Sequence, residues 1–167
     1  SNLRGVVHAA GVLDDGMLMQ QSPERFLKVA GPKVNGAWNL HSQTKDLPLD
    51  FFVLFSSVAS IIGSPGQSNY AAANAFMDGL AHHRKHQGLV ATSINWGPWA
   101  DVGMAASDVV LQRLMKDGWQ PMNAGQGCNF IGHLLTARDL PQAAVLPIDW
   151  VQFASNMPGA INWSILS

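Results

Sequence analysis

Short apolar runs separated by helical patterns predict an α/β protein. Residues 51–55 form an unbroken apolar run, which is typical of a strand covered on both faces in a parallel sheet. Shorter runs predict strands at residues 6–7, 89–95 and 143–150. Since these strands alternate with helical segments, we expect a sheet of parallel strands with helices packed against it.

Apolar residues at helical spacing predict the segments between the strands. Ser22 and Pro23 supply a capping side chain and a first-turn proline for one helix. Gly31 and Pro32 are expected to interrupt this helix, because proline lacks a backbone donor and clashes with the preceding turn. The pattern resumes at Val34, a loop follows at residues 61–69, and further helices are predicted at residues 70–86 and after the capping residues 107 and 123.

Composition excludes several classes of protein. The chain has 167 residues, 47% of them hydrophobic and 13% charged, and its formal net charge is −1. This length suits one domain with a buried core, and the low charge fraction excludes a disordered chain. The balanced charge argues against a nucleic-acid partner, and no apolar run approaches the roughly 18 residues of a membrane span. The single cysteine cannot form an internal disulfide, so we expect a reducing, cytoplasmic location.

Two further features each allow a functional and a structural interpretation. His82 and His86 stand four residues apart, a spacing that can bind a metal on a helix. No Glu or Cys completes a site nearby, so we expect no metal and a solvated helix face. Cys128 has apolar neighbours and is expected to be a buried small hydrophobe rather than a nucleophile.

Four polar side chains gather where this fold is expected to bind a ligand. Ser57 lies just past the strand of residues 51–55, and ligands of open parallel sheets bind beyond the carboxyl ends of strands. Tyr70 and Asn74 are four residues apart and share one helical face, while Lys33 lies at the helix interruption. A hydroxyl, a phenol, an amide and an ammonium suit the reduction of a carbonyl, whose oxygen gains negative charge as hydride arrives.

Each of the four side chains has a plausible part in that reaction. Ser57 would hold the carbonyl oxygen, and Tyr70 would give the proton, because a phenol has a pKa of about 10 and is protonated at neutral pH. The ammonium of Lys33 would favour the phenolate and so make Tyr70 a better acid. Asn74 would orient Lys33 or an intervening water.

Three motifs surround these residues: Phe55-Ser56-Ser57, the segment Gln-Ser-Asn-Tyr-Ala-Ala-Ala-Asn at residues 67–74, and Trp96-Gly97-Pro98-Trp99. Together they resemble the ketoreductase domains of modular polyketide synthases, which belong to the short-chain dehydrogenase/reductase superfamily. The likeness runs from His8 to about Trp150. It implies a Rossmann-like, doubly wound parallel sheet, with an asparagine rather than a lysine four residues after the tyrosine. The catalytic tetrad that it implies is Lys33, Ser57, Tyr70 and Asn74.

The resemblance also implies a cofactor and a tethered substrate. NADPH would donate the hydride, Ala9, Ala10 and Gly11 match a loop that lines its site, and Pro98 and Trp99 match the loop beside the nicotinamide. The substrate would be a β-ketoacyl thioester on the phosphopantetheine arm of an acyl carrier protein.

Residues near the tetrad bear on the stereochemistry of the product. Leu13, Asp14 and Asp15 match the Leu-Asp-Asp signature of B-type ketoreductases, and Ile62 stands where A-type members typically carry tryptophan. The resemblance therefore implies a B-type domain that makes a D-configured β-hydroxy product. Met104 falls in the segment that matches the mobile substrate lid.

The family's Gly-rich turn, G-x-G-x-x-G after the first strand, is not among these residues. The first predicted strand has almost nothing before it, so we expect the earlier strands and this turn to lie in a missing N-terminal half. Residues 1–156 would then be the catalytic portion and residues 157–167 a tail or linker. We expect the chain by itself to bind NADPH weakly or not at all, and its partners to include that half and other synthase domains.

Two alternatives stay open at this point. Many such synthases contain a truncated reductase-like half that only braces its neighbour, and the Gly-rich and tetrad residues of such a half are usually degraded. The intact tetrad here favours an enzyme, but the missing half leaves this structural alternative open. A free-standing reductase of small ketones is a third possibility, against which the placement of Asn74 and Lys33 argues.

Overall fold

The computed structural model describes residues 2–101, 108–137 and 140–156. The chain divides into two compact units, one of residues 1–96 with 132–144 and one of residues 97–131 with 145–167. Within the described ranges, no helix has the length and apolar character needed to cross a membrane. The division of the sequence into a catalytic portion and a tail stays a prediction, because residues 157–167 lie outside the described residues.

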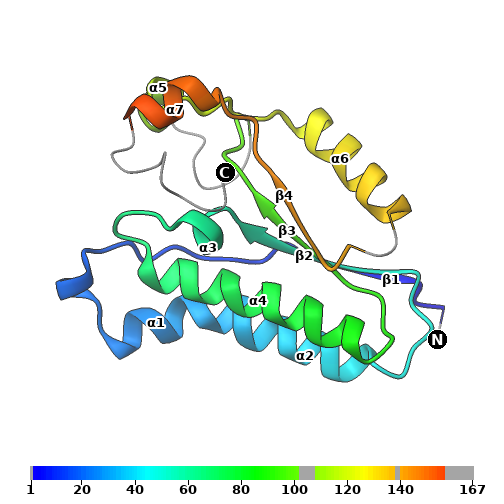
Figure 1. Ribbon diagram of the computed structural model, residues 1–167. Helices are drawn as coiled ribbons and strands as arrows, with labels where there is room; N and C mark the ends of the chain where they lie inside the picture. Colours follow the sequence, from blue (N-terminus) through cyan, green and yellow to red (C-terminus); the bar gives the residue numbers. More distant parts are fainter. Residues whose placement is uncertain (1, 102–107, 138–139, 157–167) are drawn as a thin grey trace. The chain divides into compact units, whose positions relative to one another are not determined.

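A four-stranded parallel sheet confirms the predicted α/β class (Figure 1). Gly5 stands opposite Phe51 in the register of the first two strands, and a Cβ there would lie 2.2 Å from the Phe51 ring, so a larger residue would displace that ring. In spatial order the strands are β1 (Gly5–His8), β2 (Phe51–Ser57), β3 (Thr92–Trp96) and β4 (Gln142–Val145).

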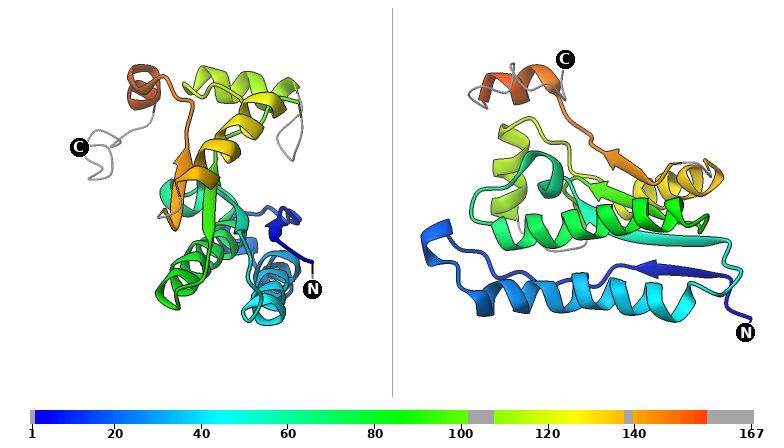
Figure 2. Two further views of the ribbon diagram at one scale, coloured as in Figure 1. Left: turned by 90° about the vertical axis from the view of Figure 1, so that its right-hand side faces the viewer. Right: turned by 60° about the horizontal axis from the view of Figure 1, so that its bottom comes forward.

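Two long helical stretches cover one face of the first unit's sheet. One stretch consists of α1 (Pro23–Ala30), η2 (Gly31–Asn35) and α2 (Gly36–Thr44), and it runs beside α4 (Ser68–His86) (Figure 2). Ser22 caps α1 as predicted, since its hydroxyl accepts the Arg25 amide at 3.4 Å. The core between sheet and helices contains Val6, Ala37, Leu49, Phe52, Leu54, Met77, Leu80, Ala81 and Ala91.

The predicted interruption at Gly31-Pro32 was wrong. The helix continues through η2 as one turn of π-helix, in which the Gly36 amide donates to the Gly31 carbonyl five residues earlier. This wider turn accommodates the proline ring that would clash with an ordinary α-helical turn. The consequence is that Lys33 lies within a helix and not in a break.

Other boundaries also differ from the sequence prediction. The strand predicted at residues 89–95 begins at Thr92 and ends at Trp96. The predicted loop at residues 61–69 is shorter, because α3 (Ala59–Ile62) precedes it and α4 begins at Ser68. The predicted last strand at residues 143–150 ends at Val145, and α7 (Trp150–Asn156) follows. Asp149 caps α7, since its Oδ1 accepts the amides of Val151 and Gln152, each at 3.1 Å. A short 3₁₀ helix, η1 (Leu18–Gln20), was also not predicted.

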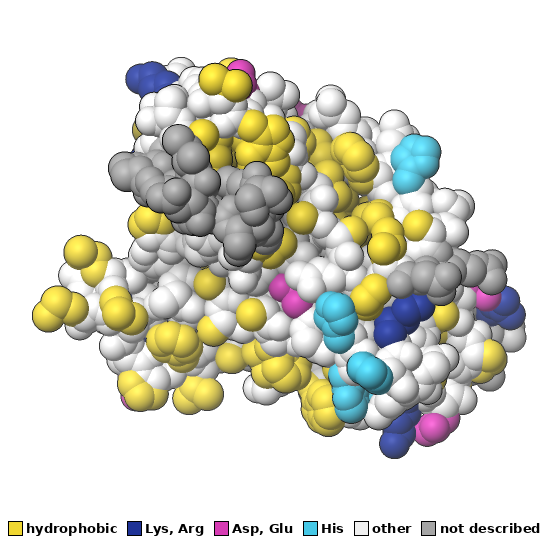
Figure 3. All heavy atoms as spheres, viewed as in Figure 1, with side chains coloured by type: hydrophobic (Ala, Val, Ile, Leu, Met, Phe, Trp, Pro, Cys, Tyr) yellow, Lys and Arg dark blue, Asp and Glu magenta, His cyan; other side chains and the backbone are white. Residues whose placement is uncertain are grey.

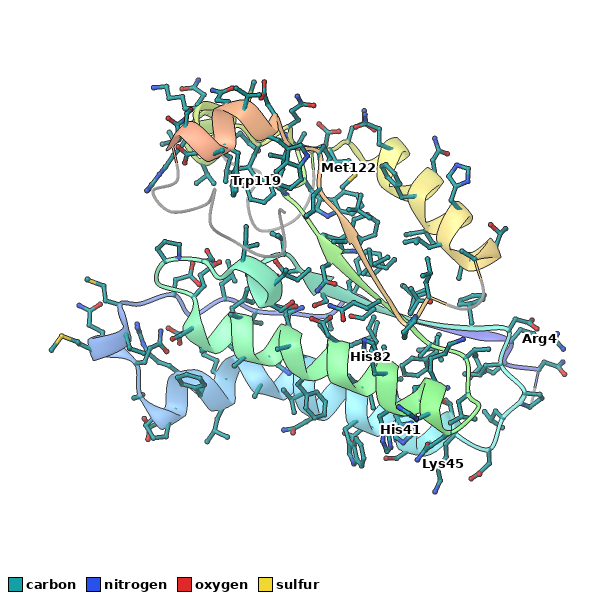
Figure 4. All side chains as sticks on the ribbon, viewed as in Figure 1. Arg4, His41, Lys45, His82, Trp119 and Met122 are labelled. Atoms are coloured by element: carbon teal, nitrogen blue, oxygen red, sulfur yellow. The ribbon has the colours of Figure 1, made fainter. Side chains whose placement is uncertain are left out.

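The second unit has its own small core. Trp119 and Met122, labelled in Figure 4, are buried, and the Trp119 ring meets Phe153 edge-on at 5.5 Å between centroids. Asn123 caps the following helix as predicted, because its Oδ1 accepts the Gln126 amide at 2.9 Å. The helices here are α5 (Asp108–Lys116), α6 (Ala124–Thr136), whose last turn falls in the first unit, and α7.

Cys128 is exposed, so the prediction that it is buried was wrong. Gly127 takes the inward position of α6, where a Cβ would lie 2.2 Å from the Trp99 ring. The next residue of an α-helix points about 100° away from that direction. Cys128 therefore lies on the outer side of the helix.

His82 and His86 are exposed, as the solvated-face interpretation expects. Figure 3 shows histidine side chains at the surface where α2 and α4 end, and Figure 4 places His82 there. Among the described residues, no group of three His, Cys, Asp or Glu side chains could hold a metal ion. Arg84, on the same helix, is buried and does not belong to this exposed face. Its Nη1 lies 3.1 Å from His41 Nδ1, and its guanidinium carbon lies 3.9 Å from the centroid of the Phe52 ring.

Candidate active site

Four of the side chains singled out in the sequence converge at the carboxyl end of β2. Ser57 is the last residue of that strand, and Lys33 comes from the π-helical turn η2. Tyr70 lies in the first turn of α4 and Asn74 in the next, so both face the same way. All four belong to the first unit, and its fold alone brings them together.

The Lys33 ammonium is almost fully buried. Its side chain is 3% exposed, its Nζ donates to the Phe55 carbonyl at 3.1 Å, and it lies 5.2 Å from the centroid of the Tyr70 ring. Burial lowers the pKa of Lys33 to about 8, against the opposing effect of the Asp78 carboxylate. At neutral pH the side chain therefore keeps its charge and presents a cation to the tyrosine.

Burial also governs the Tyr70 phenol. Its pKa is raised above the ordinary value of 10.0, chiefly by burial, while hydrogen bonding from the Ser57 and Asn74 side chains acts in the opposite direction. The sequence argument expected the Lys33 ammonium to make this phenol a better acid; in the structure burial is the largest influence on its pKa and acts in the opposite direction. The phenol is fully protonated at neutral pH, which is the form a proton donor needs.

Asn74 is bound to its own helix and not directly to Lys33. The side chain is completely buried, and its Nδ2 donates to the Tyr70 carbonyl at 2.8 Å. The backbone carbonyl of Asn74 accepts the Ser56 hydroxyl at 3.3 Å. Its Oδ1 has no hydrogen-bond partner among the described residues. Asn74 therefore joins the end of β2 to α4 and presents one unused acceptor.

The loop of Leu13, Asp14 and Asp15 is held close to the tyrosine. Leu13 packs against the buried cluster that includes Tyr70. Asp14 forms ion pairs with two cationic side chains of α1, and the Asp15 carboxylate accepts the Gln67 amide at 2.9 Å. The Asp14 carbonyl also accepts a hydrogen bond from the side-chain amide of Asn69, the residue before Tyr70. Ile62 ends α3 and is half-buried.

The residues assigned to the cofactor fall into two groups. Ala9 and Ala10 are exposed and follow the carboxyl end of β1 with Gly11, where small side chains leave the backbone accessible. This fits a ligand that approaches the backbone closely. Pro98 and Trp99 lie in the second unit, where the Pro98 carbonyl accepts the Met122 amide at 3.0 Å. Met104 lies outside the described residues.

Sequence reasoning missed a set of buried polar residues behind the tetrad. Asp78 lies on the Asn74 face of α4, and it contacts Ser60, Ser93 and Asn95. The sequence held one signal for it: Asp78 stands four residues after Asn74 and eight after Tyr70, on the same helical face.

The parallel sheet and the converging lysine, serine, tyrosine and asparagine define a class of protein, the Rossmann-type reductases with the short-chain dehydrogenase/reductase arrangement. Comparison with known proteins agrees. Residues 1–101 match the KR domain family. The chain belongs to this family, the ketoreductase domains of modular polyketide synthases.

Relatives match nearly the whole chain. A polyketide synthase of Streptomyces halstedii is 47% identical over 166 residues, which is 99% of this chain and 2% of that protein. A phenolphthiocerol synthesis polyketide synthase of Mycobacterium marinum is 50% identical, over 80% of this chain and 6% of that protein. A solved A-type ketoreductase of a modular polyketide synthase is 38% identical with a TM-score of 0.87, over 96% of this chain and 36% of that one. The chain thus spans a small part of its curated relatives and about a third of this solved ketoreductase.

Proposed function

We propose that this protein reduces the β-keto group of an acyl thioester carried on the phosphopantetheine arm of an acyl carrier protein, with NADPH as the reductant. The observation that carries the proposal is the convergence of Lys33, Ser57, Tyr70 and Asn74 at one end of the sheet. Membership of the family supports the reaction class. The carrier-bound substrate, the cofactor and the neighbouring synthase domains as partners are part of this proposal.

The residues of the chain would divide the reaction between them. NADPH, when bound, supplies the hydride that adds to the carbonyl carbon. Ser57 would donate a hydrogen bond to the carbonyl oxygen, where negative charge develops, and Tyr70 would transfer its phenolic proton to that oxygen. Lys33, with a pKa of about 8, would stabilise the phenolate that remains. The product is a β-hydroxyacyl thioester.

We further propose that the domain is of the B type and makes the D-hydroxy product. The support is the Leu13-Asp14-Asp15 loop, which packs on the Tyr70 cluster and is anchored to α1 and α4. Ile62 in place of a tryptophan supports the same assignment. The solved A-type relative, at 38% identity, shares the fold, so the fold by itself does not decide the type. Chiral chromatography of the product tests this: mainly L-hydroxy product would refute it.

NADPH oxidation with a β-ketoacyl thioester tests the function. The 167-residue chain would be assayed beside a form extended upstream through its Gly-rich turn, and we expect activity in the extended form. Tyr70→Phe should nearly abolish that activity while the fold, followed by circular dichroism, stays intact. Ser57→Ala should lower the activity as well, because it removes the proposed hydrogen bond to the carbonyl oxygen. Ser42→Ala, at an exposed serine, is its matched control and should leave the activity unchanged.

The structural alternative predicts a different result. If both forms fold and neither oxidises NADPH, the chain braces a neighbouring domain and the proposed reduction is wrong. If Tyr70→Phe keeps most of the rate, the proton donor is misassigned.

A further inference from the structure

A buried carboxylate lies behind the four converging side chains. Asp78 is 8% exposed, and its two oxygens accept hydrogen bonds from Ser93 Oγ at 2.6 Å and from Asn95 Nδ2 at 2.9 Å. Ser60 Oγ lies 2.6 Å from Asp78 Oδ2. A buried carboxylate is costly unless donors surround it, so these contacts are needed to hold it there.

Asn95 extends this network across the sheet. The side chain is completely buried on β3, and its Oδ1 accepts the Gln142 amide from β4 at 3.0 Å. Its Nδ2 also lies 3.2 Å from Ser56 Oγ and 2.8 Å from Ser60 Oγ. Three strands and α4 therefore meet in one set of hydrogen bonds, which fixes their relative positions.

Two links join the network to the proposed catalytic residues. Ser60 Oγ lies 2.8 Å from the carbonyl oxygen of Ser57. The Ser56 hydroxyl, which Asn95 contacts, donates to the Asn74 carbonyl. The strand end that presents Ser57 and the helix that presents Asn74 are thus held against each other through the Asp78 network.

The Asp78 carboxylate of the network also acts electrostatically on Lys33, since it opposes the effect of burial on the pKa of that lysine. Within the described residues Asp78 takes part in no ion pair, because its partners are neutral hydroxyl and amide groups. The charged and titratable groups that face Lys33 are His8 from β1 and Tyr70 and Asp78 from α4. Of these, Asp78 favours the ammonium form.

We propose that Asp78 is a positioning residue of the reductase site: its carboxylate ties the Ser57 end of β2 to the Tyr70 and Asn74 helix and balances the buried ammonium of Lys33. This inference rests on the proposed function. It assigns Asp78 no contact with substrate or cofactor. Its effect passes through the placement of Ser57 and the charge of Lys33.

The test is Asp78→Asn in the full-length protein that contains this chain. The change keeps the size of the side chain and removes its charge. Misplacement by a fraction of an ångström should lower kcat on the order of tenfold or more, with KM little changed. Loss of the negative charge should lower the pKa of Lys33, so the alkaline limb of the kcat profile should move to lower pH. Asp46→Asn, at an exposed carboxylate, is the matched control and should change neither.

A second readout does not depend on catalysis. The Lys33 side chain can be titrated by NMR, assigned by comparison with Lys33→Met, and its midpoint should fall in Asp78→Asn. If the unchanged protein proves inactive, the proposed function fails, and this titration still tests the charge balance. An unmoved Lys33 midpoint, or a wild-type kcat with an unmoved alkaline limb, would overturn the inference.

If Asp78→Asn does not fold, Ser60→Ala takes its place. This change cuts the link between Asp78 and Ser57 but leaves the carboxylate charge. We expect a lower kcat with the alkaline limb in its original position. An unchanged kcat would contradict the positioning role.

Discussion

Replacing Lys33 by methionine should stabilise the fold while it removes the proposed activity. Burial lowers the pKa of this lysine from 10.5 to about 8. Each tenfold change in proton affinity is worth about 1.4 kcal/mol, so holding the ammonium in the folded protein costs roughly 3 kcal/mol at pH 7. Methionine keeps the apolar stem and carries no charge. The lost hydrogen bond to Phe55 offsets about 1 kcal/mol, which leaves a net gain of about 2 kcal/mol.

The pH dependence of this gain identifies its cause. Below pH 8 the lysine is charged in the folded and the unfolded protein, and the cost of burial is present in full. Between pH 8 and 10.5 the unfolded chain binds more protons than the folded one, so the wild type gains stability as pH rises. At pH 10 the remaining cost should be below about 1 kcal/mol, and the advantage of the variant should disappear.

Urea unfolding followed by tryptophan fluorescence at pH 7 and at pH 10 measures both quantities. Lys45→Met is the matched control, because Lys45 is exposed at the end of α2 (Figure 4) and its loss should change stability little at either pH. A Lys33→Met variant that is less stable than the wild type at pH 7 would refute the reasoning. A stability difference that does not change with pH would refute it as well.

Three other substitutions test separate parts of the structure. Gly118→Ala should cost about 2 kcal/mol or more in thermal or urea unfolding, because the residue has a φ of +88° and a Cβ would lie 2.7 Å from the Phe153 amide nitrogen. Arg4→Ala should leave the urea midpoint almost unchanged, since its ion pair with Asp50 is exposed, and a clear loss of stability would contradict this expectation. Arg84→Met should change the free energy of unfolding by no more than about 1 kcal/mol, because the cost of burying a guanidinium whose pKa burial lowers to about 10 is removed together with its hydrogen bonds to the Val90 carbonyl and His41; a loss of stability as large as that of Gly118→Ala would count against this balance.

The parallel sheet and three of the four converging residues could be predicted from local pattern. The apolar run of β2 ends at Ser57, and the four-residue spacing of Tyr70 and Asn74 fixes their common helical face. These features depend on neighbours in the sequence. A short motif therefore determines them.

The environment of those residues could not be predicted in the same way. The rule that proline breaks helices gave the wrong result at Pro32, where the chain forms a π-helical turn that packs against α4. The contact between Asp78 and Asn95 joins residues 17 positions apart, and that between Asn95 and Gln142 joins residues 47 apart. Such contacts depend on how the strands are ordered, which no local pattern states.

The π-helical turn also makes the length of its segment a constraint. Along the helical stretch of α1, η2 and α2, Val29, Lys33, Ala37 and His41 are buried at intervals of four residues. In a regular α-helix, each interval of four residues would turn the direction of the side chain by about 40° around the helix axis. The wide turn at Gly31–Asn35 unwinds the helix locally and cancels much of this drift. The wide turn therefore keeps Lys33 and the buried residues on either side of it on one side of the helix. The number of residues in the turn, and not only their identity, sets the direction in which the ammonium points.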